Sequence, residues 1–176
     1  MKRTNRLQSR GPKIVTLNNV IFPIWLILFF PPVILITLAG NFIIDLVVLL
    51  ICFYIYKLGE FIALKELLRK GIWKVWIFGF LADMLGAGLL LIANFSLPYE
   101  WVNGIMFDPF SHPASVLFIV IAILLSSTLI FLLNYRVSFI KLIPDKALRL
   151  KSALLIAIVT APWTFLLPTK WFSHGF

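Results

Sequence analysis

Long apolar runs constrain this chain more than any other feature of its sequence. The 176 residues are 61% hydrophobic and 13% charged, whereas a typical soluble domain is about 45–50% apolar and about 25% charged. A soluble core of this size cannot hide so much apolar surface, but a lipid bilayer can. The sequence therefore predicts an all-α fold, a polytopic integral membrane helix bundle with five transmembrane helices. The expected spans cover about residues 17–39, 42–58, 72–94, 113–134 and 147–167.

Lysine and arginine residues fall in three clusters around these runs. Met1–Lys13, Lys57–Lys74 and Arg136–Lys151 each hold five, and Lys170 is the sixteenth. Basic loops stay in the cytosol under the positive-inside rule. The clusters predict a basic cytosolic arm over residues 1–13 and a single transmembrane domain over 14–176, with the N-terminus in the cytosol and the C-terminus outside. The same charges predict contact with anionic lipid headgroups on the cytosolic side.

The first run leaves alternatives open. A basic arm before an apolar run is also typical of a signal peptide, but this run exceeds the usual apolar length of about 7–15 residues, which favours a retained span. Pro31 and Pro32 interrupt the run near mid-membrane. Broken helices line substrate sites in transporters, and a plain kink accommodated by packing is the alternative. Gly40 and Asn41 are expected to turn the chain into the second span, with Asn41 as its N-cap and Asp45 beside the positive end of the helix dipole.

Two segments between the runs have patterns of their own. Residues 57–71 are amphipathic, with Glu66 and Lys70 spaced as a helical ion pair and Gly71 expected to end the helix. A helix on the membrane surface is favoured there, and a continuation of the second span or a docking segment is the alternative. Residues 95–112 hold five aromatic residues and no Lys or Arg. This pattern predicts an external loop lying on the membrane, with a lid or docking surface as the alternative.

Asp83 is the most informative residue because it lies near the middle of the third run. A charged Asp at that depth costs about 2.5–3.5 kcal/mol on insertion scales, so its side chain is expected to face protein or a wet cavity. Asp83 is interpreted either as a proton, cation or substrate-ammonium site or as a hydrogen-bonded contact between helices. Small residues share its helix face and predict the close approach of a neighbouring helix: Gly79, Ala82, Gly86 and Ala87.

Three hydroxyl residues, Ser126, Ser127 and Thr128, form the polar cluster of the fourth run. They lie near mid-membrane depth, so they are candidates to complete a polar site with Asp83. The alternative is that each hydroxyl donates to the carbonyl four residues earlier in its own helix.

Several classes of function lack support in the sequence. No basic stripe with interleaved aromatics indicates nucleic-acid binding, and a single cysteine, Cys52, excludes an internal disulfide. Glu100, Asp108 and His112 are too weak a pattern to predict a metal site. Neither a zinc-protease nor a serine-hydrolase motif is present. We therefore predict no catalytic residue, no metal and no cofactor.

Three functional classes remain. The preferred interpretation is a non-catalytic membrane subunit or accessory protein of a larger assembly, with a membrane-protein partner or a second copy of the chain. The first alternative is a small transporter, substrate-capture component or channel that uses a midplane polar site at Asp83. The second is a membrane-embedded enzyme acting on lipid. Composition and brevity favour a multi-pass protein of a bacterial plasma (inner) membrane.

Overall fold

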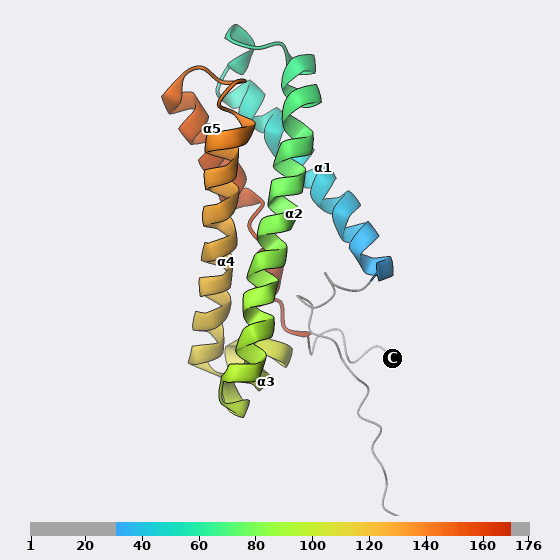
Figure 1. Ribbon diagram of the computed structural model, residues 1–176, viewed down its shortest axis with the longest axis vertical. Helices are drawn as coiled ribbons and strands as arrows, with labels where there is room; N and C mark the ends of the chain where they lie inside the picture. The colour runs from blue at the N-terminus through green and yellow to red at the C-terminus, as the bar shows by residue number, and fades with distance from the viewer. Residues whose placement is uncertain (1–30, 170–176) are drawn as a thin grey trace, which may run out of the picture.

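The computed structural model of the protein describes residues 31–169, and this part of the chain is helical with no strand (Figure 1). The long helices are α1 (Pro31–Ile55), α2 (Leu64–Ser96), α4 (Pro113–Leu133) and α5 (Lys146–Val159). Shorter elements connect or extend them: the 3₁₀ turns η2 (Leu58–Glu60), η3 (Pro109–Ser111) and η5 (Trp163–Leu166), the helix α3 (Tyr99–Phe107), and the π-helical turn η4 (Asn134–Ser138).

Four helical segments among the described residues are long and apolar enough to cross a membrane. They are Leu35–Ile55, Leu64–Ser96, Pro113–Ser138 and Lys146–Leu166. The all-helical fold and the multi-pass membrane class are therefore as predicted. Most of the expected first span, residues 17–39, lies outside the described residues, and its last nine residues are the beginning of α1.

The predicted turn at Gly40 and Asn41 is wrong, because α1 continues through both residues to Ile55. Gly and Asn favour turns, but an open turn among apolar residues would leave backbone groups unpaired in lipid, whereas the helix satisfies them all. No other residue crowds Gly40. Asp45 is consequently placed in the middle of a 25-residue helix rather than in the first turn of a new one.

The expected end of a surface helix at Gly71 is also wrong. Only Leu58–Glu60 forms a separate short turn, and α2 begins at Leu64 and runs through Gly71 to Ser96. Its 33 residues extend about 50 Å, which exceeds the roughly 30 Å of a bilayer core. The polar first turns of α2, with the Glu66–Lys70 ion pair, therefore extend the membrane helix beyond its apolar part.

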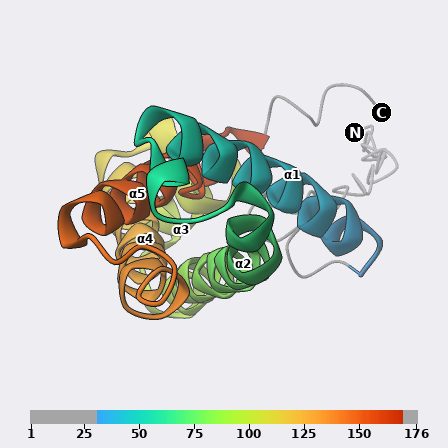
Figure 2. The same cartoon turned by 90° about the horizontal axis from the view of Figure 1, so that it is seen from above.

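The helices form an elongated bundle in which α2 and α4 pack side by side and α1 crosses α2 at an angle (Figures 1 and 2). Two apolar clusters follow one another along α2. The first includes Val75 and Ala82 together with residues of α1 and α5, and the second begins at Ala87 and includes Leu90. Asp83 lies at the junction of the two clusters.

The charges are divided between the two ends of the bundle. Every Lys and Arg of residues 31–169 lies at the end where α1 joins α2 and α4 joins α5 (Figure 1). We call this the basic end; it carries Lys57, Lys65, Arg69, Lys70, Lys74, Arg136, Lys141, Lys146, Arg149 and Lys151. The connection 97–112 at the opposite end carries Glu100 and Asp108.

Candidate functional site

A pocket of about 170 Å³ opens beside the middle of α1 and α2. Three parts of the chain line it: the central turns of α1, one face of α2, and the segment where α5 ends and η5 begins. Polar and apolar groups both contribute to the lining, which consists of Thr37, Asn41, Ile44, Asp45, Gly79, Asp83, Val159, Thr160, Ala161, Pro162, Thr164 and Phe165.

Two carboxyl groups face this pocket from different helices. Asp45 of α1 is 3% exposed and Asp83 of α2 is 6% exposed. Asp45 lies about 15 Å along the helix from the end of α1 at Ile55, which places the pair within the membrane-spanning part of the bundle. None of the lining residues within 31–169 is Lys or Arg. Two buried acids therefore share one site without a basic partner among its lining residues.

Asp83 has an unsatisfied oxygen. Its Oδ1 is buried and has no hydrogen-bond partner among the described residues. A buried polar atom without a partner is costly and usually indicates a role or a bound species. Asp83 therefore brings to the pocket wall a carboxyl group whose hydrogen bonding is incomplete within residues 31–169.

Gly79 lies where α1 meets α2 at the site. A Cβ added at Gly79 would lie 3.6 Å from Oδ2 of Asp45, an ordinary van der Waals distance, so the Asp45 carboxyl lies against α2 at this residue. Gly79 precedes Asp83 by one helical turn and lies on the same face. The sequence predicted Gly79 as a packing residue; the structure places it in the wall of the pocket.

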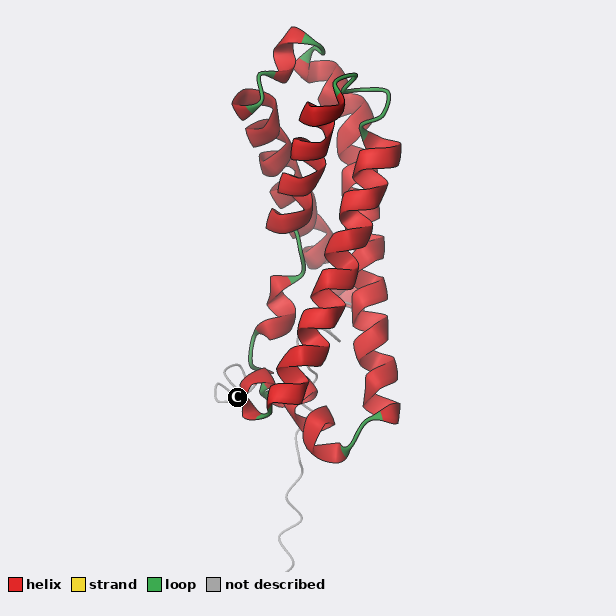
Figure 3. Ribbon diagram, turned by 90° about the vertical axis from the view of Figure 1, so that its left-hand side faces the viewer, coloured by secondary structure: helices red, strands yellow, loops and turns green. Residues whose placement is uncertain are grey.

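The third wall of the pocket is an interruption in a membrane helix. Helix α5 ends at Val159, residues 160–162 are not helical, and η5 starts at Trp163 (Figure 3). Pro162 has no N–H to donate to Ile158 O, and in a continuous helix its ring would clash with that carbonyl, so α5 ends before this residue. Hydroxyl and indole groups satisfy two nearby carbonyls: Thr160 Oγ1 donates to Ile156 O at 2.9 Å, and Trp163 Nε1 donates to Ile158 O at 2.9 Å.

The expected partners of Asp83 lie elsewhere. Ser126 Oγ donates to Ala82 O at 2.9 Å and Ser127 Oγ donates to Ala157 O at 3.0 Å, so these hydroxyls join α4 to α2 and to α5. Thr128 Oγ1 donates to Leu124 O within α4. None of the three lines the pocket. All three hydroxyls of this cluster donate to backbone carbonyls, and the bonds of Ser126 and Ser127 join different helices.

The small residues near Asp83 lie at helix contacts. Ala82, Gly86 and Ala87 are buried, like Gly79. A Cβ added at Gly86 would collide with Ser126 Oγ and would lie 3.2 Å from Ala122 O. The face of α2 that carries Asp83 thus meets α4 at Gly86 and α1 at Gly79.

Other singled-out residues take no part in this site. Pro31 and Pro32 are the first residues of α1, and the chain before them lies outside the described part. The expected outer loop contains α3 and η3, with His112 as N-cap of α4, where its Nδ1 accepts from the Ala114 N–H at 3.1 Å. No group of three potential metal-ligating residues occurs within residues 31–169.

Asp45 is not among the predicted site residues because a turn was expected at Gly40 and Asn41. That turn would place Asp45 in the first turn of a new helix, where the helix dipole stabilises its charge and no functional role is needed. One signal could have revealed it: residues 42–56 are too short for a span, and extending that run backward through Gly40 places Asp45 at membrane depth.

No protein-family model matches the chain, and no curated protein or solved structure matches it either.

Proposed function

We propose that the protein is a small membrane transport protein that binds a cation at the Asp45–Asp83 pair. The observation that carries this proposal is the meeting of two buried carboxyls in one pocket at the interruption of α5. Ionising both groups would place two like charges in a low-dielectric site without a basic partner in its wall. A proton, a metal cation or an ammonium group between them removes this cost.

The lining favours a small cation with oxygen ligands. The lining includes residues with carboxylate, amide and hydroxyl oxygens, namely Asp45, Asp83, Asn41 and Thr160, and hard cations prefer oxygen ligands. The pocket has room for a few water molecules or a small ammonium compound, since one water occupies about 30 Å³ in the liquid. We therefore propose that the substrates are inorganic cations, protons or small amines.

The interrupted helix supplies a place for movement. Discontinuous helices at membrane depth are typical of transporter sites, where non-helical backbone lines a cavity. Residues 160–162 separate α5 from η5 beside the acid pair. We propose that η5 moves relative to α5 about Pro162. This movement would expose the pocket first to one side of the membrane and then to the other.

The orientation follows from charge. We propose that the basic end faces the cytosol, because positively charged loops resist translocation, and that residues 97–112 and the chain after Thr169 face outside. The basic arm 1–13 lies outside the described residues, and its cytosolic location stays a prediction.

Cation flux into proteoliposomes tests the function. Vesicles containing the purified protein and a pH-sensitive dye are given a membrane potential with K⁺ and valinomycin, and Na⁺ uptake is followed in a parallel preparation. We expect flux of protons or Na⁺ through the wild type and its loss in Asp83→Asn. The matched control is Glu100→Gln, which makes the same carboxylate-to-amide change on an exposed residue and should keep the flux.

A non-catalytic subunit, the interpretation that the sequence favoured, predicts a different result. Such a protein needs the acid pair only for assembly, so no flux would be seen in any variant and the purified protein would bring a stoichiometric partner from mild detergent. Absence of proton, Na⁺ and small-amine flux in well-folded wild-type protein would contradict the transport proposal.

A further inference from the structure

A second polar cluster lies at the basic end, far from the acid pair along the bundle. Its centre is Arg149 of α5, whose side chain is 9% exposed and whose guanidinium carbon lies 4.8 Å from the centre of the Tyr135 ring. Within residues 31–169 no ion pair joins Arg149 to a carboxylate. Asp145 lies one turn earlier, but its Oδ1 accepts from the Leu148 N–H at 2.7 Å and caps α5. The Arg149 side chain is therefore largely buried, and no carboxylate within residues 31–169 pairs with it.

Three buried polar atoms of η4 and α5 have no hydrogen-bond partner among residues 31–169: Nε of Arg149, Oγ of Ser138 and Oγ of Ser152. The Cys52 thiol lies beside Ser152 and donates to its carbonyl at 3.9 Å. Ser152 follows Arg149 by one turn of α5, and Ser138 ends η4, which packs against α5. Asn134 donates through Nδ2 to Ile130 O and leaves a buried Oδ1 acceptor without a partner. A buried charge with unpaired donors around it is costly unless something else occupies the site.

We propose that Arg149, Ser138 and Ser152 bind a phosphate group at the basic end. A guanidinium presents its N–H donors in a fork that matches two phosphate oxygens, and hydroxyl donors complete the shell. Stacking on Tyr135 holds the plane of the guanidinium in place. The Asn134 Oδ1 acceptor suits a hydroxyl of a headgroup or of hydrogen phosphate.

The π-helical turn is what creates the cluster. Helix α4 widens at Asn134–Ser138 before the chain turns at Phe139, and such turns occur frequently at functional sites. Exposed cations on η4, on the connection to α5 and on the first turns of α5 raise the local concentration of anions: Arg136, Lys141, Lys146 and Lys151.

The phosphate has two sources. The cluster lies near the first turn of α5 at one end of a membrane-spanning bundle, the depth at which anionic phospholipid headgroups lie. A soluble phosphate offers the same oxygens. Both sources are tested with one protein preparation.

The experiment measures thermal unfolding of the purified full chain in mild detergent. Phosphatidylglycerol is titrated against phosphatidylcholine, and inorganic phosphate is titrated separately against chloride at equal ionic strength. We expect a rise in Tm that saturates with phosphatidylglycerol or with phosphate. Arg149→Gln should raise the half-saturating concentration about ten- to hundredfold, the effect of losing charged hydrogen bonds. Lys151→Gln removes the same charge from an exposed position of α5 and should raise it about fivefold or less.

If Arg149→Gln does not fold, variants that leave the net charge unchanged still test phosphate binding. Ser138→Ala and Ser152→Ala remove unpaired hydroxyls without changing charge, so they should fold and bind the anion more weakly, while Thr128→Ala, also a loss of one hydroxyl, should bind as wild type does. Saturation by phosphatidylglycerol alone assigns a lipid, and saturation by inorganic phosphate without lipid assigns a soluble anion. The proposal is wrong if neither probe raises Tm, or if both serine variants respond like the wild type.

Discussion

The carboxyl group of Asp45 lies against Gly79, one helical turn before Asp83, so the acids of α1 and α2 enter the same pocket. A methyl group at this position would meet Asp45 Oδ2 at an ordinary contact distance of 3.6 Å, so Gly79 marks the place where α1 contacts α2. The acid pair, the glycine and the interruption of α5 thus form one unit.

Substitutions at Asp83 separate a functional acid from a structural contact. Asp83→Asn keeps hydrogen bonding without the charge, so we expect a folded protein that has lost cation flux. Asp83→Leu removes the polar group and crowds the pocket, so we expect poor assembly, seen as aggregation in size-exclusion chromatography. An Asp83→Asn protein with full flux would make Asp83 a contact between helices only.

Gly86 and Gly88 offer a matched test of helix packing. Gly86→Ala places a methyl group against Ser126 Oγ and Ala122 O, so it should destabilise the bundle by about 1–3 kcal/mol. Gly88→Ala meets nothing within 4 Å and should be neutral or stabilise the helix by up to about 1 kcal/mol. Thermal unfolding in detergent measures both; equal Tm values for the two variants would count against the close approach of α4.

The Ser126 hydroxyl should contribute through its bond to Ala82 O. We expect Ser126→Ala to lower stability by about 0.6 kcal/mol, the average for hydrogen bonds between membrane helices, without loss of cation flux. Thr128→Ala is the comparison, because its hydroxyl bonds only within α4 and it should have a smaller effect. Loss of flux in a folded Ser126→Ala protein would place this hydroxyl in the transport site instead.

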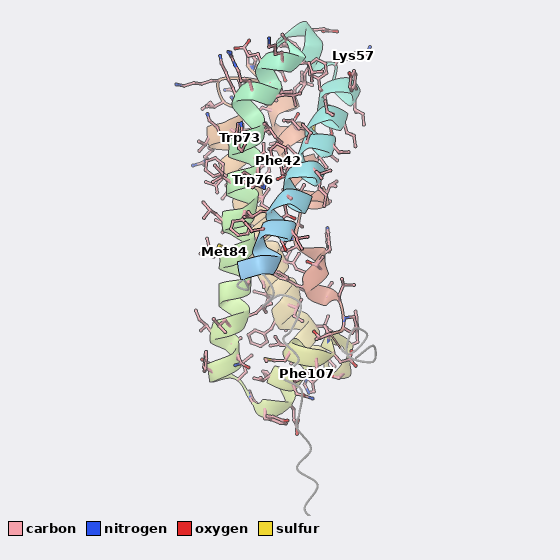
Figure 4. The ribbon with its side chains drawn as sticks, turned by 90° about the vertical axis from the view of Figure 1, so that its right-hand side faces the viewer. Phe42, Lys57, Trp73, Trp76, Met84 and Phe107 are labelled. Carbon is pink, nitrogen blue, oxygen red and sulfur yellow. The ribbon has the colours of Figure 1, made fainter. Side chains whose placement is uncertain are left out.

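The aromatic contacts of α1 and α2 support the crossing of these helices. Phe42 packs against Trp73 and Trp76 with ring centres 5.5 and 5.7 Å apart (Figure 4), and Trp76 Nε1 donates to Leu38 O at 2.8 Å. The contacts of these two tryptophans with α1 depend on the continuous helix through Gly40, which local turn preferences did not reveal.

Much of the architecture was predictable because long apolar runs have few solutions in lipid. The burial of Asp83 could be predicted because this residue lies in the middle of a long apolar run. The partner of Asp83 could not be predicted in this way. The Ser126 hydroxyl donates to the backbone carbonyl of Ala82, and the sequence does not show which carbonyl a hydroxyl will bond. Pro162 was visible in the sequence, but only the arrangement of α5 against α1 and α2 shows that its break faces the acids.

Cysteine labelling tests the proposed orientation. In a Cys52→Ala background, Glu100→Cys should react with a membrane-impermeant maleimide added outside intact cells, and Lys141→Cys should react only after the membrane is opened. Both positions are exposed and lie at opposite ends of the bundle. The reverse labelling pattern would show that the basic end faces outside. Labelling of both cysteine variants from outside would also contradict a basic end in the cytosol.

Infrared difference spectroscopy of the carboxyl stretch tests the central claim most directly. The purified protein in lipid is exchanged between acidic and alkaline buffer, and between buffers with and without Na⁺ or a small amine. Proton or cation binding at the pair should give carboxyl bands in the wild type and in Glu100→Gln. These bands should be absent from the double variant Asp45→Asn, Asp83→Asn. Identical difference spectra for the wild type and the double variant would show that the pair binds neither a proton nor a cation, and the account would be wrong.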